Sequence, residues 1–164
     1  NGEAETESWA RGLVANMARP PMGGDRDQIR AAAAGQCDLA IANTYYLGQM
    51  LNSDDNAERT AAQSIGVFWP NQDDRGVHVN VSGAGVVTHS RNTDNAVRLI
   101  EFMAGDSAQR WYAEANQEYP VKPGVEWSGT LTELGEFQAD AVNLGMLGDF
   151  NAAAVRLMDR AGWR

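Results

Sequence analysis

Apolar residues recur every three or four positions along most of the chain. This spacing gathers them on one face of a helix. Asp25, Thr93 and Asp106 stand where helix N-caps are expected, and Gly35 stands where a helix should stop. The pattern predicts helices over residues 3–17, 25–34, 45–51, 56–63, 93–104 and 106–116, and a helical stretch broken by glycines over 130–163, clearest at 150–158.

Shorter runs are continuously apolar or alternate with period two, which is typical of strands. They predict strands over residues 37–42, 65–69, 77–81 and 86–88. Helices and strands alternate in the first half, which indicates an α/β fold. The later helices have too few strands to cover, so we expect part of the sheet to come from sequence outside this chain.

Composition limits the classes of function. The chain has 164 residues and a formal net charge of −9, so it suits one domain and lacks the basic face that nucleic-acid binding requires. No apolar run approaches the roughly 20 residues that span a bilayer. The chain begins at Asn1 in Glu-rich helical sequence without a signal peptide, so we expect a cytoplasmic protein or a mature or truncated piece of an exported one. The single cysteine, Cys37, lies in an apolar run and is expected to be a buried, inert thiol.

Tyr45 and Tyr46 stand side by side where a predicted strand opens into a predicted helix. This junction is where α/β proteins place ligand sites. Adjacent residues on a strand face opposite ways, but at the first turn of a helix both rings can reach one point in front of the helix end. A phenolate is a hard oxygen ligand suited to ferric iron. A plainer interpretation puts one ring in the core and the other on the surface.

A second candidate is the glycine-containing loop before residue 25, which leads into a helix N-terminus and could leave N–H groups for an anion. The same letters also describe an ordinary loop before a capped helix. His78 and His89 fit no metal-binding spacing, and we find no nucleophilic triad, phosphate loop or paired cysteines. These absences argue against a zinc or nucleophilic enzyme.

Several runs, in this order, resemble the periplasmic ferric-iron-binding proteins of bacterial ABC transporters. They are EAETESW at 3–9, ARPPMGGDRDQI at 18–29, NTYY at 43–46, NVSGAGV at 80–86, NAVRLIEFM at 95–103 and NQEYPV at 116–121. The resemblance runs from Gly2 to about Val125 and continues more weakly to the end.

The resemblance implies a type II periplasmic-binding-protein fold, in which two three-layer αβα lobes close on a ligand like a flytrap. It implies that Tyr45 and Tyr46 are phenolate ligands of Fe³⁺ and that Asn43 contacts a synergistic anion such as carbonate or phosphate. Asp25 and Arg26 are further candidates for anion binding.

Members of that family are about twice as long, so the chain resembles their carboxy-terminal half. Residues 1–70 and 126–164 would build the second lobe. Residues 71–125 would form the hinge crossing and a segment that returns to the first lobe, whose remainder is absent.

The resulting expectation is a monomeric periplasmic protein that delivers ferric iron to a membrane permease, without inserting in the membrane itself. The missing amino-terminal half would be its other partner. Two alternatives remain: a binding protein for a small anion or organic solute that stacks on the tyrosines, and an enzyme that uses a tyrosine as acid or base. The second alternative needs a partner base near the pair, and the sequence shows none.

Overall fold

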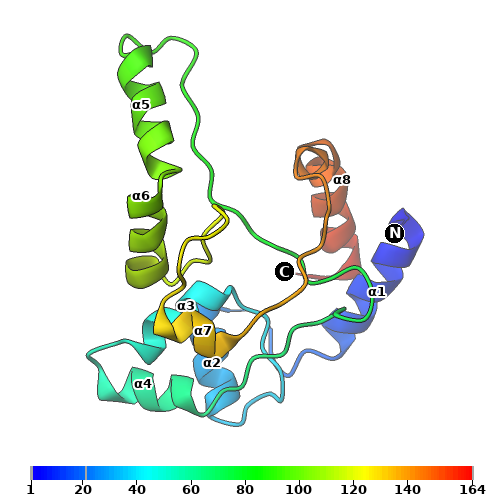
Figure 1. Ribbon diagram of the computed structural model, residues 1–164. Helices are drawn as coiled ribbons and strands as arrows, with labels where there is room; N and C mark the ends of the chain where they lie inside the picture. Colours follow the sequence, from blue (N-terminus) through cyan, green and yellow to red (C-terminus); the bar gives the residue numbers. More distant parts are fainter. Residues whose placement is uncertain (1, 21, 164) are drawn as a thin grey trace.

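The structure is a computed structural model that describes residues 2–20 and 22–163, and its regular secondary structure there is helical (Figure 1). Pro21, in the loop that carries part of the resemblance, lies outside the described residues. The predicted helices are confirmed, and the stretch 130–163 divides into two. The elements are α1 (Glu3–Ala15), α2 (Asp25–Ala33), α3 (Thr44–Leu51), α4 (Asn56–Gln63), α5 (Thr93–Met103), α6 (Asp106–Trp111), the π-helical turn η1 (Tyr112–Asn116), α7 (Gly129–Leu134) and α8 (Gly145–Ala161).

Helices α2, α3 and α4 share the main hydrophobic core. Its buried residues are Ile29, Leu47, Met50 and Ala62, and Leu134 at the end of α7 packs against them. Glu58 on α4 accepts hydrogen bonds from Arg26 and Arg30 on α2, which ties the two helices at their polar edge. Because Leu47 and Met50 of α3 are buried in this core, the rotation of α3 about its own axis is fixed.

The two ends of the chain meet in a second, smaller core. Ala10 of α1 packs with Leu157 and Ala161 of α8, all of them buried. Arg160 Nη2 donates to Glu3 Oε1 over 2.8 Å and to Glu7 Oε2 over 2.9 Å. Figure 1 shows these helices (blue and red) beside one another, away from the α2–α4 core.

None of the four predicted strands forms a strand among the described residues, so this part of the sequence prediction is wrong for the isolated chain. One isolated parallel bridge joins Val77 to Ala139. The extended segments instead expose apolar side chains: Leu39 is 82% exposed and Phe68 79%. A strand needs a neighbouring strand to satisfy its backbone groups, and outside that bridge the described residues supply none to these segments.

Helices α5 and α6 stand apart from the core (green, Figure 1). Helix α5 has no buried residue, and Leu99 on its apolar face is 58% exposed. Trp111 at the end of α6 is exposed as well. A long connection through residues 77–92 leads to α5. Because Leu99 and Trp111 are exposed, helices α5 and α6 have an apolar surface that the described residues do not cover.

Three predicted N-caps shift by one residue. Gly24, Asn92 and Gly105 are the N-caps, and Asp25, Thr93 and Asp106 are the first residues of their helices. An acid in the first turn still interacts favourably with the helix dipole. Gly35 has φ +69° directly after the C-cap of α2, which confirms the predicted stop.

No helix within the described residues is both long enough and apolar enough to cross a bilayer.

The bridge at Val77 depends on Gly76. Gly76 has φ +92°, and a Cβ there would lie 2.5 Å from the carbonyl oxygen of Gln138. Val77 N donates to that same carbonyl over 2.9 Å, so the backbones must approach closely. We expect Gly76→Ala to lower the free energy of unfolding by roughly 2–3 kcal/mol, because it adds both backbone strain and a clash.

Urea unfolding of both proteins measures this difference. Gly66→Ala is the matched control, since no atom lies within 4 Å of a Cβ at Gly66 and its φ is not positive. Equal losses from the two variants would contradict the account of Gly76.

Candidate functional site

The tyrosine pair occupies the first turn of α3. Asn43 is the N-cap, and Tyr46 N donates to Asn43 O over 3.2 Å. Leu47 and Met50, further along the helix, are buried in the main core. The buried face fixes the helix, so the two tyrosine side chains leave its N-terminal end together.

The two phenol rings lie against each other. Their centroids are 4.4 Å apart and their planes meet at 44°. Both residues are half-buried, and Tyr46 also packs against the edge of the main core. The structure therefore keeps the rings together, rather than one in the core and the other alone on the surface.

The pKa of Tyr45 is raised above its ordinary value. Burial is the main cause, and hydrogen bonding to the Tyr46 phenol and its charge add to it. The negative charges of Asp25 and Glu118 raise it further. The metal-free site thus favours the neutral phenol, so a bound cation must itself drive deprotonation.

Asp25 lies next to the start of α3. Its Oδ1 accepts from Asn43 N over 2.7 Å and from Asn43 Nδ2 over 3.3 Å. Asn80 Nδ2 donates to Asn43 Oδ1 over 3.2 Å. Three segments, around residues 25, 43 and 80, therefore converge beside the tyrosines.

Arg26 turns to other partners. Its Nη1 donates to both carboxylate oxygens of Glu58 over 3.3–3.4 Å, and its Nη2 donates to Gln49 Oε1 over 2.9 Å. The guanidinium links α2 to α3 and α4. The structure brings four of the residues singled out from sequence together: Tyr45, Tyr46, Asn43 and Asp25. Arg26, the fifth, instead connects α2 to α3 and α4.

Glu118 is a candidate that sequence reasoning missed as a site residue. It acts on Tyr45 electrostatically, although 73 positions separate the two residues in the numbering. Gln117 before it is buried at φ +58° and packs so tightly on α3 that a Cβ at Gly48 would lie 2.6 Å from Gln117 Cβ. Residues other than glycine rarely adopt this left-handed conformation. The run NQEYPV contained the residue, but no local pattern gave its position.

Tyr119, the residue after Glu118, is held in place by aromatic contacts and a hydrogen bond. Its ring makes edge contacts with Trp127 and Phe137, each with centroids 5.0 Å apart. Its hydroxyl donates to Gly135 O over 3.1 Å, and burial raises its pKa to about 12. The backbone of Glu118 is thus held between two fixed neighbours, Gln117 and Tyr119.

The remaining metal-ligand types do not gather. Within the described residues, no group of three or more His, Cys, Asp or Glu side chains could hold a metal ion. Cys37 is half-buried, so its predicted full burial is wrong, and His78 and His89 are exposed. The phenols therefore remain the candidate metal ligands.

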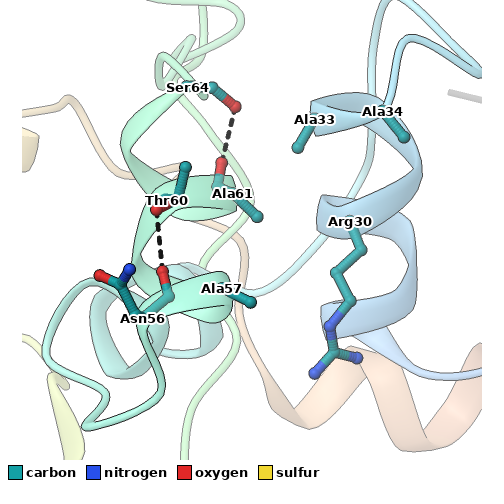
Figure 2. A pocket seen from close by; sticks show the side chains of 8 residues that line it. All are labelled: Arg30, Ala33, Ala34, Asn56, Ala57, Thr60, Ala61 and Ser64. Carbon is teal, nitrogen blue, oxygen red and sulfur yellow. Dashed lines mark hydrogen bonds between the residues drawn. The ribbon is translucent and has the colours of Figure 1, made fainter.

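The residues at the tyrosine pair are half-buried. A wide, shallow groove lies elsewhere, between α2 and α4, as Figure 2 shows. It is lined by Arg30, Ala33, Ala34, Asn56, Ala57, Thr60, Ala61 and Ser64. Its surface is mostly that of small side chains, and neither tyrosine takes part.

Comparisons with known proteins identify homologues over the whole chain, although no protein-family model matches. Iron uptake protein A1 of Synechocystis is 46% identical over 164 residues, which are 100% of this chain and 46% of that protein. A Fe(3+)-binding periplasmic protein of Serratia marcescens is 26% identical over 162 residues, 98% of this chain and 46% of that protein. The FutA (IdiA) structure of Trichodesmium, in complex with iron and citrate, superimposes with a TM-score of 0.96 at 43% identity, covering 100% of this chain and 52% of that one.

These matches define the class of protein. The chain shares the fold of solved ferric-binding periplasmic proteins, which have the type II binding-protein fold. Its homologues are iron uptake and ferric iron-binding proteins, so the resemblance seen in the sequence is confirmed. The chain spans about half the length of these relatives.

The pKa of Tyr119 makes stability depend on pH. The folded pKa is about 12, against about 10 for an exposed tyrosine, so the folded state holds this proton more tightly. The stabilisation is complete below pH 10 and is lost as pH rises through about 12. We expect the unfolding free energy of the native protein to fall more steeply over that interval than that of Tyr119→Phe.

Urea unfolding at a series of pH values tests this. Tyr112→Phe, which removes a different hydroxyl, is the control and should keep the native slope. Parallel pH profiles for the native protein and Tyr119→Phe would rule out the burial effect.

Proposed function

We propose that this chain is part of a two-lobed protein that captures ferric iron and delivers it to an ABC-transporter permease. Tyr45 and Tyr46 are its phenolate ligands. The observation that carries the proposal is the pair of phenols in contact at the first turn of α3, in a chain whose homologues are iron uptake proteins. The role is binding and delivery, not catalysis.

Two phenolates do not complete a ferric coordination shell. The other ligands come from the lobe that this chain lacks and from a small oxygen anion of the carbonate, phosphate or citrate kind. The Trichodesmium relative with iron and citrate supports such a combination. The sequence offered Asn43, Asp25 and Arg26 as anion-binding candidates, but in the structure Asp25 is bonded to Asn43, and Arg26 donates to Glu58 and Gln49.

The unpaired surfaces support the proposed domain plan. In that plan, residues 1–70 and 126–164 form the second lobe, and 71–125 form the hinge crossing and the return to the first lobe. The exposed Leu39 and Phe68 and the open apolar face of α5 are surfaces that the missing half would cover. When strands of the missing half pair with the extended segments, these segments complete the three-layer αβα arrangement.

The proposed setting is the periplasm. A relative described as periplasmic supports it. The protein works there as a monomer that carries its cargo to the permease, and closure of the two lobes on iron is the signal that the permease reads.

The proposal predicts an iron-dependent colour in the two-lobed protein. Ferric iron should produce a visible phenolate-to-metal charge-transfer band. Tyr45→Phe and Tyr46→Phe should each weaken the band and lower iron affinity by at least about 100-fold, more than loss of an outer-shell partner usually costs.

Visible spectroscopy during a ferric titration, with a competing chelator to set the free iron, measures both effects. Tyr112→Phe is the matched control, because the ring of Tyr112 packs against Trp111 and not against the pair. A native protein that stays colourless would refute the iron proposal. Binding of a small solute that is unchanged by metal would favour the stacking alternative.

A further inference from the structure

Asn43 makes several hydrogen bonds within the chain itself. Its backbone N–H and its side-chain amide donate to Asp25 Oδ1, and its Oδ1 accepts from Asn80 Nδ2. Its carbonyl accepts from Tyr46 N. An anion that used the backbone N–H of Asn43 would have to displace Asp25, and one that used the second N–H of the side-chain amide would lie beside the Asp25 carboxylate.

The contact between the Asp25 carboxylate and Asn43 is stabilised from both sides. It is the first residue of α2, where the positive end of the helix dipole favours a carboxylate. Its bond to Asn43 N is short at 2.7 Å, which is typical of a charge-assisted hydrogen bond. The carboxylate is therefore held by both helices, with α2 carrying it and the N-cap of α3 donating to it.

We propose that the Asp25 carboxylate serves as a built-in anion at Asn43, so that phosphate and carbonate do not bind at this corner of the iron site. The inference rests on the proposed function, since it names the part that Asp25 plays beside the phenolates. Any external anion on the iron then occupies other coordination positions.

Charge supports this assignment. The Asp25 carboxylate accepts from Asn43, the N-cap of the helix whose first turn carries Tyr45 and Tyr46, so its negative charge lies beside the proposed metal position. A phosphate held by Asn43 would lie beside this carboxylate, and like charges at short range repel each other. The same carboxylate attracts a ferric ion. Asp25 thus favours the cation and excludes the extra anion.

The substitution Asp25→Asn should open the corner to phosphate. It removes the charge, retains an oxygen that can accept from Asn43 N, and adds a second amide donor beside that of Asn43. Asp27→Asn is the matched control: it removes the same charge from the same helical turn, where Asp27 accepts from Gly24 N and Arg30 instead.

The experiment titrates inorganic phosphate into the iron-free two-lobed protein and measures heat by calorimetry. We expect Asp25→Asn to bind phosphate at least about tenfold more tightly than the native protein or Asp27→Asn, a difference of about 1.4 kcal/mol. After ferric loading, phosphate should shift the visible band of Asp25→Asn and leave the native band unchanged.

Tight phosphate binding by the native protein, with no gain in Asp25→Asn, would overturn the inference. Circular dichroism checks that the variant folds, and Asp25→Ser supplies a second charge-removing variant. The native titration decides the matter even if both variants fail to fold. The ferric band is read separately, so its absence from the native protein would count against iron binding while the phosphate heats still decide the role of Asp25.

Discussion

The site depends on the way α3 begins. Two adjacent side chains point apart on a strand and diverge by about 100° around a helix, so only the open first turn lets them converge beyond the helix end. Leu47 and Met50 anchor the buried face of α3, which fixes the direction in which Tyr45 and Tyr46 leave it. Glycine at position 48 then admits Gln117 against the same helix.

This anchoring recruits distant parts of the chain to one place. Asp25 comes from the start of α2, Asn80 from the long connection and Glu118 from the segment after η1. Each is held by its own constraint: a helix dipole, an amide hydrogen bond, and a strained residue beside an aromatic cluster. The first turn of α3 is where these constraints meet.

The helices and the tyrosine pair could be predicted from sequence because their causes are local. Apolar spacing, acids in first turns and Gly35 act within a few residues. The strands could not be judged in the same way, because a ladder requires partners and the described residues give Val77 only a single bridge to Ala139. The alternating pattern at residues 77–81 predicts what the segment does in a complete sheet, not what it does alone.

The roles of individual polar residues were the hardest to predict. Arg26 contacts Glu58, 32 positions away, and Asp25 contacts Asn43, 18 positions away. Glu118 is brought to the site by Gln117 and Tyr119, whose packing has no signature in sequence. The sequence identified the neighbourhood of the site, and the fold decided which side chain meets which.

The electrostatics of the site favour a highly charged cation. An ordinary tyrosine with a pKa near 10 costs about 4 kcal/mol to ionise at pH 7, and the raised pKa of Tyr45 adds to that. A weakly charged ion gains little from two neutral phenols. A trivalent ion gains more than a weakly charged one from two phenolates, and in the proposed function this gain offsets the loss of the protons. In the proposed function, the raised pKa of Tyr45 therefore favours a highly charged ion such as ferric iron, and it links release of the metal to return of the proton.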